Sequence, residues 1–255
     1  MLWYKTWLET RWRFMIGLGL LLCSAAGVVF GYHTALAMIE HVPQIDLGGE
    51  LGRRVQEQIE LSREYRGYVW TQGFRQNLAQ MGTLFAVLLG TGGLLPQGSG
   101  GGALFTLSLP ASRRRLLAVR VGTGLAQWFA LALVPALMIA LWSPMVGESF
   151  ALTSAIGHGL CLFVAGAVFF SMAVLLSTIF GDVWRPLLFT LLIAMLQAIP
   201  AQFFPDLSRF SLAGVMSGES LFRAGQLPWM GLLVSVALAA VLLYGAARNL
   251  ERHDF

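Results

Sequence analysis

The chain has 255 residues, of which 56% are hydrophobic and 12% are charged, and its mean hydropathy is +0.69. Soluble domains carry about 25% charged residues, so this composition excludes an ordinary soluble protein and indicates an integral membrane protein. The formal charge of +4 does not point to a nucleic-acid partner, because the excess arginine lies beside apolar runs, where membrane orientation and anionic lipid explain it.

Apolar runs of membrane length recur along the chain. At about 1.5 Å per residue, about 20 residues cross a hydrocarbon core of about 30 Å. We therefore expect an all-α fold, a single permease-like domain with six transmembrane helices. They are predicted over residues 14–37, 78–95, 121–142, 156–180, 186–204 and 228–247. Small residues are frequent in the second and fourth spans, which indicates close packing inside a bundle.

The first residues, 1–13, read MLWYKTWLETRWR, with Trp3, Trp7 and Phe14 at helical spacing. Aromatic rings on one face and charges on another are typical of a helix in the headgroup region, so an interfacial elbow helix is predicted here. The alternative, the start of a signal peptide, does not fit. The apolar run that follows is far longer than the 7–15 residues of a signal peptide.

Residues 40–76 form a polar segment that we place on the outer face. Leu47, Leu51, Val55 and Ile59 recur every fourth residue, which predicts an amphipathic helix with a narrow apolar stripe. Such a stripe usually packs on its own protein. A lid over a substrate exit is the alternative.

The densest positive charge lies in the loop 96–120, between the second and third spans. Its sequence from 95 onward is LPQGSGGGALFTLSLPASRRRLLAVR. A glycine-rich start is followed by a short amphipathic run, Pro110 ends that run, and Ser112 can cap the next helix. The pattern predicts a helix across the membrane surface, then a sharp turn back into the membrane.

The string LFTLSLPASRRRLLAVR resembles the segment after the second span in permease subunits of type-two ATP-binding-cassette (ABC) exporters. The resemblance implies a coupling helix that docks on a separate ATPase subunit. The coupling residues would be Leu104, Phe105, Thr106, Leu107, Leu109, Pro110, Ser112, Arg113, Arg114 and Arg115. Residues 206–227 likewise resemble the short re-entrant helices of this family. The alternative is a basic loop that only follows the positive-inside rule.

Charge supports a topology with both termini in the cytoplasm. Segments placed inside hold ten Lys and Arg against four acids, and those placed outside hold seven Arg against nine acids. Cytoplasmic loops collect Lys and Arg, so a multi-pass protein of the cell inner membrane is predicted.

No catalytic or metal-binding motif is present in the sequence, so we do not expect an enzyme or a cofactor bound by this chain. Gly98–Gly102 lacks the Lys-Ser/Thr of a phosphate-binding loop. Ser217–Ser220 superficially suggests a nucleophile, but no histidine is expected at a suitable depth. Cys23 and Cys161 lie inside apolar runs and are expected to be buried hydrophobes.

The middle of each predicted span is nearly free of charge, which disfavours a proton- or sodium-driven carrier. We expect a transport subunit powered by ATP and Mg²⁺ on two partner ATPase subunits, paired with a second permease in lipid. The alternative is a non-transporting scaffold that recruits a soluble partner through the basic loop. Candidate substrate-path residues are Asn77, Gln80, Gln197 and Gln202, which could instead form interhelical hydrogen bonds.

Overall fold

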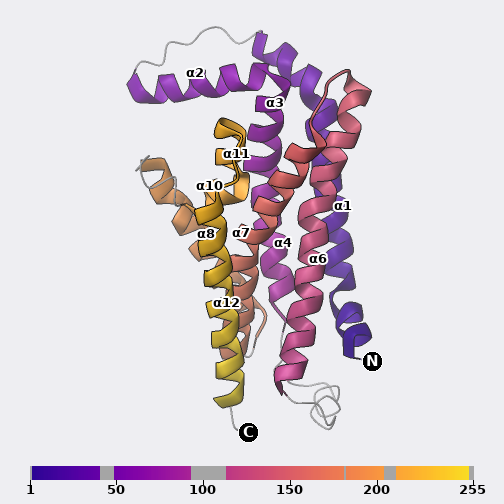
Figure 1. The fold of residues 1–255 in the computed structure, drawn as a ribbon, viewed down its shortest axis with the longest axis vertical. Coiled ribbons are helices and arrows are strands. Elements are labelled where there is room, and N and C mark those ends of the chain that lie inside the picture. Colours follow the sequence, from indigo (N-terminus) through magenta and orange to yellow (C-terminus); the bar gives the residue numbers. More distant parts are fainter. Residues whose placement is uncertain (1, 41–48, 93–112, 181, 204–210, 253–255) are drawn as a thin grey trace.

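The computed structural model describes residues 2–40, 49–92, 113–180, 182–203 and 211–252, and these are almost entirely helical (Figure 1). η1 is a π-helix and η2 a 3-10 helix. In chain order the elements are α1 (Leu2–Glu40), α2 (Gly49–Arg63), α3 (Tyr65–Tyr68), η1 (Val69–Leu78), α4 (Ala79–Gly90), α6 (Arg113–Trp142), η2 (Ser143–Val146), α7 (Leu152–Ile179), α8 (Trp184–Phe203), α10 (Leu212–Ser217), α11 (Glu219–Ala224) and α12 (Trp229–Arg252).

Four helices in the described residues are long and apolar enough to cross a membrane: α1, α6, α7 and α12. These helices have 39, 30, 28 and 24 residues, and about 20 residues are enough to cross a bilayer. They correspond to the first, third, fourth and sixth predicted spans. The described part of the protein is therefore all-helical, and four of its helices have the length and composition of membrane-spanning helices.

The second and fifth predicted spans fall on less regular elements. The prediction at 78–95 meets the end of η1 and α4, and its last residues lie outside the described ones. The prediction at 186–204 meets α8, whose apolar part, Trp184–Gln197, is shorter than a full span. The count of six spans stays a prediction.

The helical run that contains α4 begins at Tyr65, well before the predicted start of the span. α3, η1 and α4 follow one another without a break to Gly90. Polar residues such as Arg75 lower the hydropathy of the run's first half, yet one face of that half is fully buried. Trp70 is 0% exposed and Phe74 is 2% exposed, so these residues belong to the core rather than to an outer segment.

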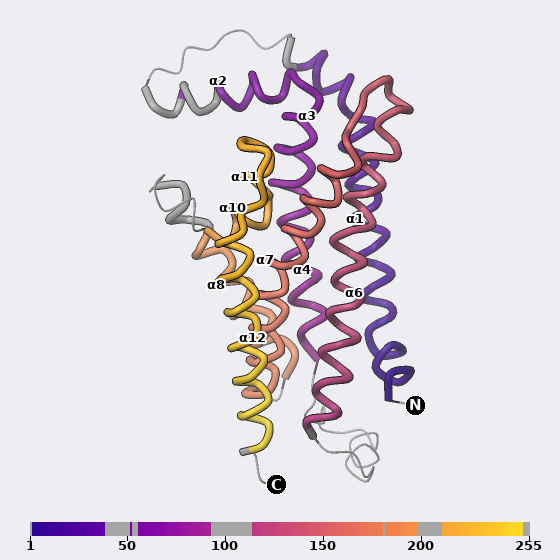
Figure 2. Tube along the Cα trace, viewed as in Figure 1, coloured from indigo at the N-terminus to yellow at the C-terminus, as the bar shows by residue number. Residues whose placement is uncertain are grey.

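α7 lies at the centre of the bundle. It packs against α12, α6, α4 and α10, while α1 packs against α6 at the side (Figures 1 and 2). In its most apolar stretch of 18 residues, 61% are buried, compared with 17% in α12. α7 is therefore a core helix, and α12 shows most of its surface to the surroundings.

The predicted elbow helix at 1–13 is not a separate element, because α1 runs unbroken from Leu2 to Glu40. Its first turns pack on α6: the side-chain amide of Gln127 donates to the Thr10 hydroxyl at 2.8 Å. Trp3 and Trp12 remain exposed, as expected for aromatic side chains at a membrane interface.

Different elements lie at the two ends of the bundle. Both chain termini and the start of α6 lie at one end, and α2 crosses the opposite end (Figure 1). α2 is the amphipathic helix predicted inside 40–76. The short helices α10 and α11 pack near that opposite end against η1 and α7, which confirms helical structure within 206–227.

Close packing of α7 depends on residues without a side chain. A Cβ on Gly166 would lie 2.2 Å from the Trp128 ring of α6, and one on Gly90 would lie 2.5 Å from the Phe170 carbonyl oxygen of α7. The Trp128 indole also donates to the Phe163 carbonyl at 2.9 Å. The small residues of the sequence thus mark real helix contacts.

Replacing Gly166 by alanine should destabilise the bundle, because the new methyl group would overlap Trp128. We expect Gly166→Ala to cost about 1–3 kcal/mol, the usual penalty of overpacking. Thermal unfolding in detergent measures the effect. Gly27→Ala is the matched control, since nothing lies within 4 Å of its added Cβ. Equal Tm values for the two variants would contradict this packing.

Candidate functional site

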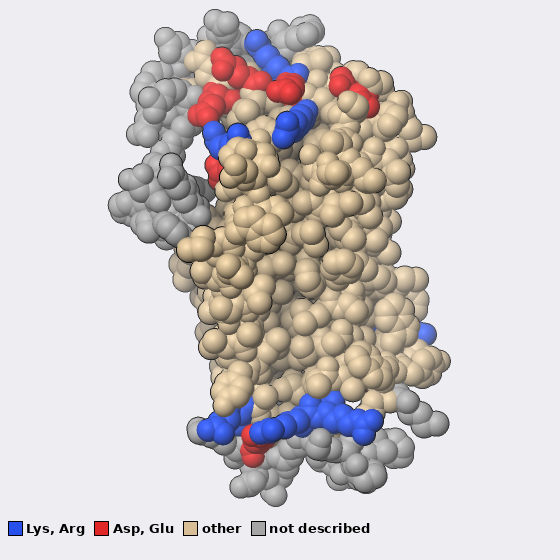
Figure 3. Space-filling view, viewed as in Figure 1, with Lys and Arg blue, Asp and Glu red and all other residues tan. Residues whose placement is uncertain are grey.

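The end of the bundle that holds both termini is strongly basic, and we call it the basic end. Figure 3 shows Lys and Arg gathered there, an uncharged band above them, and mixed charges at the opposite end. The basic side chains of its described part are Lys5, Arg11, Arg13, Arg114, Arg115, Arg120, Arg185 and Arg248, and the acidic ones are Glu9, Asp182 and Glu251. This end therefore has the charge expected of a cytoplasmic surface.

Most of the predicted coupling residues lie outside the described residues, which resume at Arg113. This applies to Leu104, Phe105, Thr106, Leu107, Leu109, Pro110 and Ser112. Arg113 is the first residue of α6, and the side chains of Arg114 and Arg115 are exposed on its first turn. What the structure describes beside the segment 93–112 is therefore its two anchors, the end of α4 and the start of α6.

The end of α4 is held by two arginines from neighbouring helices. Arg13 of α1 donates from Nη1 to the carbonyls of Leu88 at 2.9 Å and Thr91 at 2.6 Å. Arg120 of α6 donates from Nη2 to the Thr91 carbonyl at 3.4 Å. The last carbonyls of a helix lack partners within it, and a cation there also complements the helix dipole. We call Arg13, Arg120 and these two carbonyls the α4 clamp.

The residue after the clamp must be glycine. Gly92 has φ of +127°, and a Cβ there would lie 2.6 Å from Nη2 of Arg120 and 3.3 Å from Nη1 of Arg13. Any larger residue would strain the backbone and push the guanidinium groups from the carbonyls. The clamp and Gly92 together fix the point where the chain leaves α4.

The start of α6 is tied to the end of α12. Arg114 Nε donates to Glu251 Oε1, and the two side chains are 74% and 32% exposed. Three arginines at the positive end of the α6 dipole are unfavourable, and Glu251 offsets part of that cost. A pair this exposed contributes little stability.

Removing the clamp should loosen the end of α4. We expect Arg13→Gln to cost about 1.5–3 kcal/mol of local stability, the range for hydrogen bonds to a charged group. Hydrogen exchange measures this as faster exchange of the last-turn amides of α4, including the Thr91 amide that bonds Val87. Arg11→Gln, an exposed arginine two residues away, is the control. Unchanged exchange in Arg13→Gln would show that these contacts do not hold the helix end.

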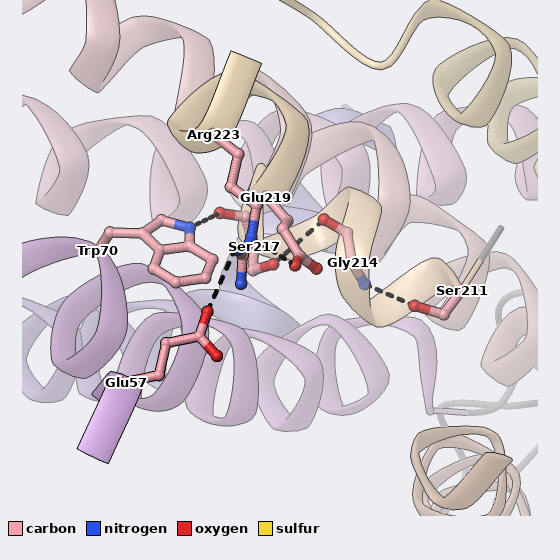
Figure 4. A network of polar contacts seen from close by, with 7 residues as sticks. All are labelled: Glu57, Trp70, Ser211, Gly214, Ser217, Glu219 and Arg223. Carbon is pink, nitrogen blue, oxygen red and sulfur yellow. Dashed lines mark hydrogen bonds and ion pairs between the residues drawn. The ribbon is translucent and has the colours of Figure 1, made fainter. Parts of the chain in front are cut away.

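The opposite end contains a second polar arrangement, around the π-helix η1 (Figure 4). The Trp70 indole donates to the Ser217 carbonyl at 3.1 Å, and its ring stacks on Phe222 with centroids 4.4 Å apart. The guanidinium of Arg75 also lies over the Trp70 ring, 5.5 Å from its centroid. Trp70 thus joins η1 to both α10 and α11.

Ion pairs extend the same arrangement to α2. Arg223 of α11 donates from Nε to Glu219 at 3.0 Å and places Nη1 3.6 Å from Glu57 of α2 (Figure 4). All three side chains are about one third to more than half exposed, so these pairs orient α11 more than they stabilise it.

His158 of α7 lies beside Ser217, which corrects the expectation that no histidine lies near this serine. Its Nδ1 donates to the Ser217 carbonyl at 3.2 Å, and its ring stacks on Phe74 at 4.4 Å. The Ser217 hydroxyl donates to the Gly214 carbonyl at 3.1 Å instead. The histidine therefore holds the backbone of α10 and forms no nucleophile–base pair with the serine.

Sequence reasoning missed the roles of Arg13, Arg120, Trp70 and His158. Arg13 and Arg120 are cations at the edge of apolar runs. Such a position indicates that the side chain has a polar partner, but it does not identify that partner. The π-helix gives no sequence signal, although ten π-helical residues are unusual and π-segments concentrate at functional sites.

Trp70→Phe should release α10 while keeping most of the ring stacking. We expect a loss of about 1 kcal/mol, one buried hydrogen bond, because the Ser217 carbonyl keeps only His158 as a donor. Faster hydrogen exchange in Leu212–Ser217 is the measurement. Trp184→Phe, at a tryptophan that is 71% exposed, should change nothing. An α10 exchange rate equal to the wild type would contradict the assigned role.

The three predicted substrate-path residues whose side chains are described lie on three elements, η1, α4 and α8. Asn77 is half-buried in η1 and Gln80 is exposed on α4 one turn later, while Gln197 is half-buried on α8, which packs on α4. The side chain of Gln202 lies outside the described ones. Asn77, Gln80 and Gln197 form no hydrogen bond with one another, and their role stays a prediction.

Comparisons with protein-family models, with curated proteins and with solved structures found no match to this chain. The structure alone therefore defines its class, a helical protein in which four helices of the described part are long and apolar enough to cross a membrane.

Proposed function

We propose that this chain is the permease subunit of an ABC exporter of the type-two class, powered by separate ATPase subunits. The observation that carries the proposal is the position of the two anchors that flank residues 93–112. These anchors, the end of α4 and the start of α6, both lie at the basic end beside the chain termini. A partner that docks on this segment would act on two bundle helices at once.

The proposal places the protein in the cell inner membrane, with the basic end and both termini on the cytoplasmic side, as the positive-inside rule favours. Six crossings would then be α1, the run from Tyr65 to Gly90, α6, α7, α8 and α12. An even number of crossings agrees with termini at one end of the bundle (Figure 1).

The helical run from Tyr65 to Gly90 suits a mechanical role. The run has 4 and 12 α-helical residues in α3 and α4, which together span about 24 Å at about 1.5 Å per residue. The ten π-helical residues of η1 lie between them and bring the run to the length of a hydrocarbon core, about 30 Å. The α4 clamp holds its lower end, and Trp70 ties its upper half to α10 and α11. Displacement of the segment 93–112 would thus reach the opposite end through one continuous element.

The distribution of charge supports an external energy source. Between the two ends, α1, α6, α7 and α12 carry no Asp, Glu, Lys or Arg over most of their length. An ion-coupled carrier needs an ionisable group near the midplane, whereas a subunit moved by a partner does not. ATP and Mg²⁺ would bind on that partner, and a second permease would complete the path.

The substrate would pass along α4, which packs on both η1 and α8. The residues predicted for the path whose side chains are described are Asn77, Gln80 and Gln197. Around them the helices are mostly apolar, which suits an amphipathic or apolar substrate that leaves the bilayer.

Co-purification tests this function. We expect the tagged chain, extracted mildly from its native membrane, to carry an ATPase in about equal amount, identified by mass spectrometry. Arg114→Glu combined with Arg115→Glu should lower ATPase recovery about tenfold, since several interfacial charges are reversed. Arg63→Glu combined with Arg66→Glu reverses the same charge at the opposite end and should leave recovery unchanged.

Glu251 supplies a further control, because Arg114→Glu also breaks an ion pair within the chain. Adding Glu251→Arg restores that pair in reverse. Recovery of the ATPase in this triple variant would mean that the arginines act through the fold rather than by docking. Absence of an ATPase from the wild-type preparation, with another soluble protein in its place, would favour a scaffold that recruits a partner through its basic end.

A further inference from the structure

A groove opens between α6 and α12 at the basic end. Its volume is about 350 Å³. Arg114 of α6 and Arg248, Glu251 and Tyr244 of α12 surround its mouth, and Val121 and Leu243 belong to its apolar wall. It is separate from the predicted substrate-path residues, and no role has been given to it so far.

The groove exists because α12 packs mainly on α7 and only sparsely on α6. Asn249 of α12 donates to the carbonyl and the hydroxyl of Thr178 on α7, both at 3.1 Å, and Ala246 is fully buried. The opposite face of α12 therefore turns towards α6 without closing on it. Arg248 and Tyr244 are exposed on that face.

The mouth of the groove carries an excess of positive charge. Arg114 is paired with Glu251, and Arg248 acts on the same carboxylate through its charge. Among the described residues that line the groove, two arginines therefore stand against one carboxylate, an excess of one positive charge. A phosphate group can accept hydrogen bonds from two guanidinium groups at once.

The wall of the groove differs from its mouth in polarity. Towards the middle of the bundle it becomes apolar, and on α12 it continues into side chains that face outward, such as Val241, which is 65% exposed. Tyr244, 66% exposed, stands between the charged mouth and the apolar wall, the usual depth of tyrosine at a membrane interface. A soluble anion would use only the mouth. A lipid would use the mouth and the wall.

We propose that this groove binds one anionic phospholipid, with its phosphate between Arg114 and Arg248 and an acyl chain along Val121 and Leu243. The site does not depend on the transporter proposal, because it uses only the charge and shape of the α6–α12 face. Glu251 competes with the lipid phosphate for Arg114, and so limits the affinity of the site.

Native mass spectrometry of the full chain tests the site with defined lipids. The protein is exchanged into micelles that contain equal amounts of phosphatidylglycerol and phosphatidylcholine, and the retained lipid is counted. We expect one phosphatidylglycerol to be retained in preference. Arg114→Gln and Arg248→Gln should each weaken retention about fivefold, the effect of one basic residue near an anionic lipid. Arg66→Gln, at the opposite end, should not.

Glu251→Gln separates binding from folding. If Arg114 binds lipid, removing its competitor should raise retention of phosphatidylglycerol severalfold. If Arg114 matters only through its ion pair within the chain, Glu251→Gln should lower retention as Arg114→Gln does, and that result would overturn the proposal. Glycerol phosphate, which has the charge without the acyl chains, distinguishes a lipid from a free anion. Its retention at the level of phosphatidylglycerol would also overturn the lipid site.

Ala118→Trp tests the apolar wall without a change of charge. Ala118 lines the groove and is exposed, so a large ring fits there without disturbing the core. We expect this variant to lose preferential retention of phosphatidylglycerol and to keep the Tm of the wild type. Full retention in Ala118→Trp would place the lipid elsewhere and contradict the site.

Discussion

Two arginine side chains that close the last turn of α4 are the contact on which the rest of this structure depends. In a membrane, lipid offers no hydrogen bonds to the free carbonyls at a helix end. Arg13 and Arg120 supply them at Leu88 and Thr91, from two different helices. One contact therefore fixes α1, α4 and α6 together at the basic end, where the chain enters and leaves the segment 93–112.

The opposite end is organised by the same helical run. Its upper half is a π-helix whose buried Trp70 holds the Ser217 carbonyl, with His158 of α7 on the same oxygen. The α4 clamp and the Trp70 contact thus lie in the two halves of one continuous helical run, α3 to α4, which packs on the central helix α7. In the proposed exporter, this arrangement would convert movement at the basic end into movement of α10 and α11.

Hydropathy was sufficient to predict α1, α6, α7 and α12, because each is a long run of apolar residues that only a helix can carry through lipid. It placed the start of the helical run that contains α4 too late, because Arg66 and Arg75 lower the hydropathy of the segment that carries the buried side chains of Trp70 and Phe74. The partners of Arg13, Arg120 and His158 lie 29 to 78 residues away along the chain, so no local pattern reveals them. The coupling residues 104–112 lie outside the described part of the chain.

Site-specific photo-crosslinking in native membranes tests the central claim most directly. A photoreactive side chain at position 115, exposed on the first turn of α6, would probe what touches the basic end, with position 63 at the opposite end as control. We expect position 115 to crosslink to an ATPase subunit and position 63 not to do so. Crosslinks from position 115 only to lipid, or to a soluble protein without an ATP site, would contradict the exporter function.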